Sequence, residues 1–168
     1  MLFRSEEGYL RVIRSKTAKL FEASTRLAAV LAQSSAATET ACADYGQALG
    51  TAFQVIDDVL DYDGDAQELG KNLGDDLREG KNTLPLIIAM QRCAQADRDL
   101  IRAAIENGDA SQMERIVGLV NACGAMQATK EAAAEQAEIA LQALAVLPDN
   151  AYKQALQALA SQLTHRQH

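Results

Sequence analysis

The chain has 168 residues, which suits one domain, and its formal net charge of −7 argues against nucleic acid or an anionic membrane surface as the main partner. No apolar run approaches the roughly 18 residues that span a bilayer, and Glu6 and Glu7 interrupt any signal-peptide pattern, so we expect a cytoplasmic protein. The three cysteines are odd in number and widely spaced, which argues against a disulfide framework or a thiolate zinc site and favours small buried side chains.

Helix should dominate, because alanine is the most frequent residue, only two prolines occur and tryptophan is absent. No internal repeat or flexible linker divides the chain, so residues 1–168 are expected to form a single all-α domain. The first helix is expected over about residues 6–33, with Ser5 as its N-cap. Its apolar residues recur at helical spacing: Leu10, Ile13, Phe21, Ala28 and Leu31.

The second helix is expected to follow residues 34–38 and to run to about residue 63, where Gly64 begins a polar loop. A short helix over 72–79 should end at Gly80, and a further helix follows Pro85. After Asn107 and Gly108, helices are expected over about 110–122, 125–146 and 149–165.

Asp57, Asp58 and Asp61 share one face of the second helix. The opposite face is an apolar stripe formed by Ala52, Val55, Ile56, Val59 and Leu60. A polar face of this kind is often simply solvated. However, like charges at i, i+4 repel each other, and no lysine or arginine occurs from residue 45 to 70 to offset them. The alternative is a divalent cation, and ligands that are all oxygen favour a hard ion such as magnesium.

A calcium loop starting at Asp61 is a competing interpretation, because Asp61, Asp63 and Asp65 have its initial spacing. It fails at two positions. The sixth, which requires glycine for the sharp turn, is Ala66, and the twelfth, which requires a bidentate glutamate, is Asn72.

The segment GKNLGDDLREGKNTLPL follows the acidic helix and mixes both charges. Lys71 and Lys81 lie among carboxylates there, which suits a phosphate ligand bridged by a metal, although ordinary surface ion pairing is an equal alternative. A Walker loop is excluded, because Gly74 to Gly80 is one residue too long and Asn82 stands where a hydroxyl should follow the lysine.

On the first helix, Thr17 places a hydroxyl in the apolar stripe. It either bonds back to the carbonyl four residues earlier, a common habit of helical threonine, or serves a ligand together with Lys16. Beside a diphosphate, Lys16 would neutralise negative charge, while the hydroxyl would offer a dipole to a cation.

Three segments in this order, SKTAKLF, GTAFQVIDDVLDY and GKNLGDDLREGKNTLPL, resemble the trans-polyprenyl diphosphate synthases, particularly the bacterial octaprenyl diphosphate synthase group. The resemblance implies the C-terminal half of an isoprenoid-synthase helical bundle. It also implies these roles: magnesium binding by Asp57, Asp58 and Asp61; diphosphate binding by Lys16, Lys71 and Lys81; an FQ pair at Phe53 and Gln54; and contact of Thr17 and Gln54 with the developing allylic cation.

The resemblance also implies a reaction: the condensation of an allylic diphosphate with isopentenyl diphosphate through magnesium-assisted ionisation. The enzyme would be a homodimeric prenyltransferase that acts in the synthesis of isoprenoids and quinone side chains. The family's first aspartate-rich motif and its upstream glycine-lysine-arginine segment have no counterpart in the chain. We therefore expect the isolated chain to be inactive and to self-associate.

Three alternative functions remain open. The first is a noncatalytic regulatory subunit that binds diphosphate, and the second is a head-to-head or cyclising isoprenoid synthase. The third is an acidic helical scaffold without a ligand.

Overall fold

The computed structural model describes residues 5–63 and 74–164. This part of the chain is helical and contains no strand, as the composition predicts. None of its helices is long and apolar enough to cross a membrane. Two compact units are present: a first unit of the residues up to Tyr9 together with Asp57–Glu131, and a second unit of Leu10–Ile56 together with the residues from Ala132 onward.

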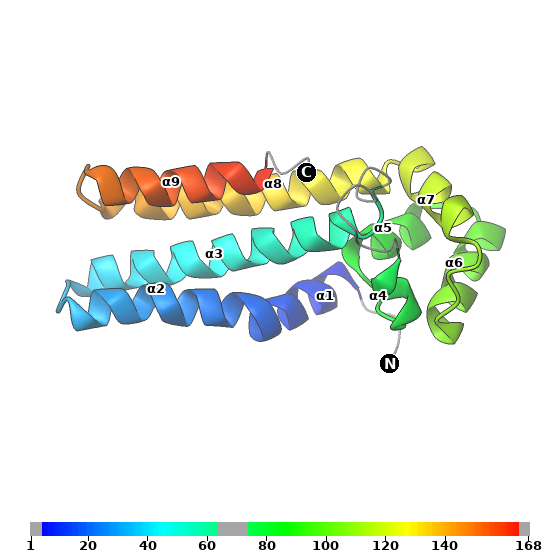
Figure 1. The fold of residues 1–168 in the computed structure, drawn as a ribbon, viewed down its shortest axis with the longest axis horizontal. Helices are drawn as coiled ribbons and strands as arrows, with labels where there is room; N and C mark the ends of the chain where they lie inside the picture. Colours follow the sequence, from blue (N-terminus) through cyan, green and yellow to red (C-terminus); the bar gives the residue numbers. More distant parts are fainter. Residues whose placement is uncertain (1–4, 64–73, 165–168) are drawn as a thin grey trace. The chain divides into compact units, whose positions relative to one another are not determined.

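The second unit is built on long helices that lie side by side (Figure 1). They are α2 (Lys19–Leu31), α3 (Ala36–Leu60), α8 (Ala125–Ala143), which a short 3-10 turn (Leu144–Val146) extends, and α9 (Ala151–Thr164). The residues of α3 after Ile56 and those of α8 before Ala132 belong to the first unit. Helices α3, α8 and α9 share an apolar core dominated by alanine, which allows close helix packing: Tyr45, Ala48, Ala52, Ala137, Ala140, Leu144, Ala160 and Leu163. The buried stripe of α3 matches the sequence prediction at Ala52, Val55, Ile56 and Val59.

Helix α3 lies close to the preceding helical segment at two glycines. A Cβ atom on Gly46 would overlap the Thr25 hydroxyl oxygen, and one on Gly50 would lie 2.7 Å from the Ala18 Cα. The Thr25 hydroxyl donates a 2.6 Å hydrogen bond to the Cys42 carbonyl on α3. Only glycine fits at these positions, so the sequence sets this helix spacing directly.

The first predicted helix is a continuous helical segment with a π-turn inside it. Its parts are α1 (Glu6–Ile13), the π-turn (Arg14–Ala18) and α2. Buried residues occur at Tyr9, Ile13 and Ala18, at spacings of four and then five, as a π-turn requires. The extra residue shifts the buried stripe, so Ala29 is buried while Leu31, expected on the stripe, is 75% exposed. A constant helical period cannot anticipate this shift.

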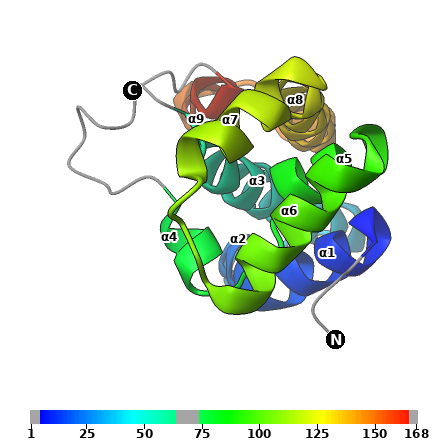
Figure 2. The ribbon, with the colours of Figure 1, turned by 90° about the vertical axis from the view of Figure 1, so that its right-hand side faces the viewer.

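The first unit is built on shorter helices, and Figure 2 shows α5, α6 and α7 facing the viewer. Its helices are α4 (Asp75–Arg78), α5 (Leu84–Arg92), α6 (Gln95–Asn107) and α7 (Met113–Ala122). Their core consists of large, fully buried aliphatic side chains: Leu77, Leu84, Leu86, Ile101, Ile105, Ile116 and Val120. The helical pattern after Pro85 does not separate α6 from α5, but the extended backbone at Cys93 and Ala94 divides them.

The three cysteines are free thiols, as the sequence predicts, but each is partly exposed and none is a buried core residue. Helix α3 ends at Leu60, three residues before the expected boundary, so Asp61 lies just beyond its last turn.

Candidate functional site

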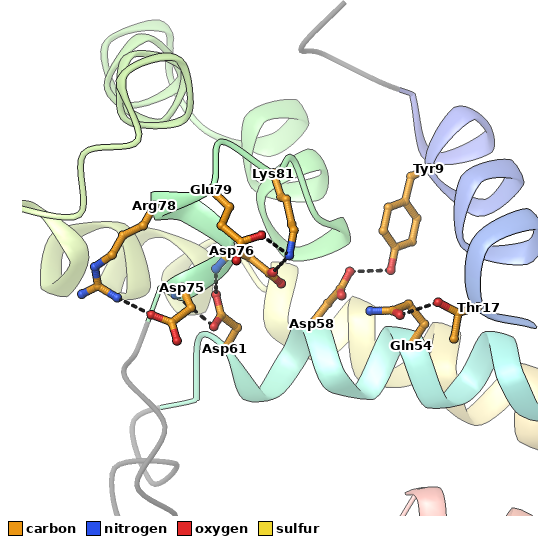
Figure 3. Close-up of polar contacts among 10 residues, drawn as sticks. All are labelled: Tyr9, Thr17, Gln54, Asp58, Asp61, Asp75, Asp76, Arg78, Glu79 and Lys81. Carbon is orange, nitrogen blue, oxygen red and sulfur yellow. Dashed lines mark hydrogen bonds and ion pairs between the residues drawn. The ribbon is translucent and has the colours of Figure 1, made fainter.

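The π-turn carries the first candidate pair, Lys16 and Thr17. Lys16 is exposed and Thr17 is half-buried. The Thr17 hydroxyl donates a 2.8 Å hydrogen bond to Oε1 of Gln54 on α3, in the second unit (Figure 3). The hydroxyl therefore bonds across to another helix and not back to its own. π-turns are frequent at functional sites, because they change the direction of side chains within a helix.

Phe53, the residue before Gln54 on α3, forms an aromatic pair with Phe21 on α2. The two ring centroids are 5.6 Å apart, and the ring planes are inclined at 37°. Both phenylalanines are partly exposed. This tilted geometry is favourable for aromatic rings and fixes the side chain next to Gln54.

The aspartates at the end of α3 are not equally exposed. Asp57 and Asp61 are partly exposed, whereas Asp58 is only 2% exposed. A fully solvated acidic face is therefore wrong for Asp58. Its Oδ2 accepts a 2.5 Å hydrogen bond from the hydroxyl of Tyr9 on α1 (Figure 3). Burial of a carboxylate is costly unless donors compensate it, so this contact is a major feature of the motif.

Asp61 joins the end of α3 to helix α4. Its two carboxylate oxygens accept hydrogen bonds from the backbone N–H groups of Asp75 (3.2 Å) and Asp76 (3.1 Å), drawn in Figure 3. Gly74 precedes these residues with a φ of 79°, a conformation that favours glycine. Burial, followed by the charge of Asp76, raises the pKa of Asp61 to about 6, although the two backbone donors oppose the increase.

Lys81 lies between two carboxylates of the same unit. Its Nζ is 2.8 Å from Oδ1 of Asp76 and 2.7 Å from Oε2 of Glu79. These hydrogen bonds raise the pKa of Lys81, so the ammonium charge is secure at physiological pH. The surface ion pairing that the sequence leaves open is thus present at Lys81. Lys71, the other lysine of the predicted site in this segment, lies outside the described residues.

The amide of Asn82, the residue after Lys81, is an unusual polar group. Both its oxygen and its nitrogen are buried, and neither has a hydrogen-bond partner among the residues that the structure describes. Buried polar groups in proteins are nearly always satisfied by protein or water. The Asn82 amide, next to Lys81 in the chain, is therefore able to donate and accept further hydrogen bonds.

The donor set of the acidic motif fits a hard divalent cation, because every side chain in it offers carboxylate oxygens. Within 5–63 and 74–164, no group of three or more His, Cys, Asp or Glu side chains converges to hold a metal. Magnesium is commonly bound through one or two carboxylates together with substrate phosphates and water. The chemistry of the residues therefore suits a cation shared with a phosphate ligand.

The sequence patterns and the family resemblance point to Thr17, Gln54, the aspartates and Lys81, but not to Tyr9. Tyr9 lies 49 residues from Asp58, and its hydroxyl acts through a tertiary contact. No local motif marks such a residue. The structure shows that Tyr9 holds Asp58 through this hydrogen bond.

Comparison with known proteins places the chain among prenyl synthases. The family model described as polyprenyl synthetase matches residues 2–123. The chain is 48% identical over 157 residues to octaprenyl diphosphate synthase of Escherichia coli (strain K12), covering 93% of this chain and 49% of that protein. It is 49% identical over 152 residues to the all-trans-nonaprenyl-diphosphate synthase (geranyl-diphosphate specific) of Rhodobacter capsulatus, covering 90% and 46%.

Solved structures show the same likeness. A decaprenyl diphosphate synthase from Rhodobacter capsulatus matches with a TM-score of 0.91 and 41% identity, over 99% of this chain and 52% of that one. A polyprenyl synthase from Caulobacter crescentus CB15, complexed with calcium and isoprenyl diphosphate, matches with a TM-score of 0.91 and 40% identity, over 100% and 52%. The chain thus spans about half the length of the curated relatives it matches.

Proposed function

Because the chain belongs to the polyprenyl synthetase family, we propose that it is part of a trans-prenyltransferase that condenses an allylic diphosphate with isopentenyl diphosphate. The relatives named above are synthases of octaprenyl, nonaprenyl and decaprenyl diphosphates. Residues 1–168 form part of one such synthase domain, which acts in the cytoplasm as a homodimer in isoprenoid and quinone side-chain synthesis.

The acidic end of α3 is the observation that carries this proposal. Asp57, Asp58 and Asp61 are assigned to magnesium, since they supply only oxygen ligands. When bound, magnesium neutralises the charge that accumulates on the departing diphosphate. The Caulobacter crescentus relative, complexed with calcium and isoprenyl diphosphate, supports the binding of a divalent cation and a diphosphate in this family.

Lys16, Lys71 and Lys81 are assigned to the diphosphate oxygens. The ammonium of Lys81 is held between Asp76 and Glu79, and its raised pKa keeps it charged. Diphosphate oxygens would replace these two carboxylates, exchanging one set of ion pairs for another. Lysine is well suited to this exchange, because its ammonium is a compact charge on a flexible stem.

Thr17, Phe53 and Gln54 are assigned to the allylic group. The hydrogen bond from Thr17 fixes the Gln54 amide one helical turn before Asp57 and Asp58 on α3. When the allylic C–O bond breaks, a carbocation forms next to the diphosphate, and the oxygen dipoles of Thr17 and Gln54 stabilise it. The double bond of isopentenyl diphosphate then forms the new C–C bond. The released diphosphate accepts the proton that is lost, and this restores neutrality at carbon.

A ligand-dependent shift in melting temperature tests the site. Magnesium with inorganic diphosphate should raise the melting temperature of the wild-type chain, because a ligand at about 100 times its Kd stabilises the folded state by about 2.7 kcal/mol. Asp57→Asn and Asp61→Asn should each remove most of this increase. Asp44→Asn is the matched control, since Asp44 is an exposed aspartate earlier on the same helix, and it should behave like the wild type. Absence of any wild-type shift would contradict the proposal.

We expect prenyltransferase activity only from a protein that contains the complete substrate site. The chain corresponds to about half of its relatives, and we expect negligible polyprenyl product from the purified chain with magnesium and both substrates. Product formation would show that these residues suffice.

A further inference from the structure

Tyr9 and Asp58 form a buried contact that links the start of the chain to the acidic motif. Tyr9 is 4% exposed and Asp58 is 2% exposed. The Tyr9 hydroxyl donates to Oδ2 of Asp58 over 2.5 Å, a short distance typical of a hydroxyl bonded to a charged oxygen. Figure 3 shows the phenol of Tyr9 pointing at the carboxylate.

The Tyr9 hydroxyl is the donor in this contact, and the carboxylate oxygen of Asp58 is the acceptor. Asp58 makes further interactions, and the Tyr9 hydroxyl contacts its Oδ2 atom.

We propose that Tyr9 is a positioning residue for the acidic motif: its hydroxyl fixes the Asp58 carboxylate, and binding of a divalent cation with diphosphate at Asp57, Asp58 and Asp61 depends on that contact. This inference rests on the proposed function of the motif and extends it to a residue outside the motif.

Two physical effects support the dependence. Asp57 and Asp58 lie in the last turn of α3, where helices fray, and a contact to a residue 49 positions away restrains that turn. In addition, three carboxylates within five residues repel one another, and a donor on the middle one lowers the cost of holding them together. Both effects organise the motif before a ligand arrives, which improves affinity.

The test compares two tyrosines of the full chain. Tyr9→Phe removes the hydroxyl from Asp58 and keeps the ring. Tyr45→Phe is the matched control, because Tyr45 is 1% exposed and donates a 2.9 Å hydrogen bond to a backbone carbonyl, that of Leu156, and not to a carboxylate. Titration calorimetry with magnesium and inorganic diphosphate gives the Kd of each variant. Chemical denaturation gives its stability.

Tyr9→Phe should weaken binding about 10- to 100-fold, the range found when partners of metal-binding groups are removed, while Tyr45→Phe should bind like the wild type. Equal binding by Tyr9→Phe and wild type would overturn the role of Tyr9 and leave the proposed function standing. Failure of the wild type to bind would overturn both.

A measurement on the wild type applies even if Tyr9→Phe does not fold. The ¹³Cζ resonance of Tyr9 reports on its hydroxyl, and it should shift when magnesium and diphosphate are added, whereas the Tyr45 resonance should not. An unchanged Tyr9 resonance in a ligand-saturated sample would overturn the inference.

Discussion

Thr17 donates its hydroxyl hydrogen to Oε1 of Gln54, and this 2.8 Å contact connects the π-turn to α3. The acceptor is the amide oxygen, so the orientation of the amide is defined by the contact. A helical threonine commonly bonds to a carbonyl of its own helix. Thr17 instead orients a side chain on another helix.

The Thr17–Gln54 hydrogen bond should contribute measurably to stability. Thr17→Val keeps the shape of the side chain and removes the donor, and we expect the free energy of unfolding to fall by about 0.5–1.5 kcal/mol. A double-mutant cycle with Gln54→Leu, measured by urea denaturation, should show coupling of the same order. Thr17→Ser retains the hydroxyl and serves as the control. Additive effects of the two substitutions would argue against the contact.

Alanine should be destabilising at Gly50, although alanine is the better helix former. A Cβ there would lie 2.7 Å from the Ala18 Cα and 2.9 Å from Cγ of Phe21, so α3 would have to move away from the π-turn and from α2. We expect Gly50→Ala to cost about 1–3 kcal/mol. At Gly118 on α7, a Cβ would meet no atom within 4 Å, and Gly118→Ala should stabilise by about 0.5–1 kcal/mol. Thermal or urea denaturation gives both values, and a neutral Gly50→Ala would refute the close packing.

Asp61 should make stability depend on pH in a defined direction. Its pKa is about 6 in the folded chain against an ordinary 3.8, so between these values the folded state retains a proton that the unfolded state has lost. The contribution of Asp61 to stability is therefore greatest below about pH 4 and is lost as the pH rises through 6. The difference in unfolding free energy between wild type and Asp61→Asn should decrease from about pH 4.5 to about pH 7.5.

The control for this pH dependence is Asp109→Asn. A hydrogen bond from the Ser111 backbone lowers the pKa of the Asp109 carboxyl. Asp109 is thus ionised in the folded and the unfolded state across the tested pH interval. The difference in unfolding free energy between wild type and Asp109→Asn should therefore not change with pH. A flat profile for Asp61→Asn as well would show that the Asp61 pKa is not raised.

An apolar stripe on α2 should cause self-association. Leu20, Leu27 and Leu31 lie on one face of the helix and are 72%, 54% and 75% exposed. Replacing all three with glutamine should shift the chain toward monomer in sedimentation velocity, because exposed apolar clusters mark interaction surfaces. The control replaces Tyr152 and Leu159, two exposed residues of α9, in the same way. If the α2 variant sediments like the wild type, the stripe does not mediate association.

The helical fold was largely predictable, because alanine content, apolar periodicity and glycine positions act locally. Helix α8 and its 3-10 extension end at Val146, where the prediction placed the end, and α7 ends at Ala122 as expected. The division between α5 and α6 was not predictable, because neither Cys93 nor Ala94 is a strong helix breaker.

The candidate site was predictable in its residue types but not in its contacts. The charge pattern and the family resemblance identify the aspartates and Lys81. They cannot show that Asp58 is buried against Tyr9 or that Asp61 binds the backbone of α4, since both contacts join segments far apart in the sequence. Magnesium binding and the ligand-binding roles of all the candidate residues remain predictions.

The π-turn at Arg14–Ala18 gives the first helical segment an unusual tolerance to changes in length. A π-turn holds one residue more than the α-turn it replaces, so deletion of one residue there would restore regular α-helical bonding without breaking the segment. Elsewhere in a helix, the same deletion would rotate all following side chains by about 100°. Single-residue deletions that the segment can survive are therefore concentrated in the π-turn, which contains Lys16 and Thr17.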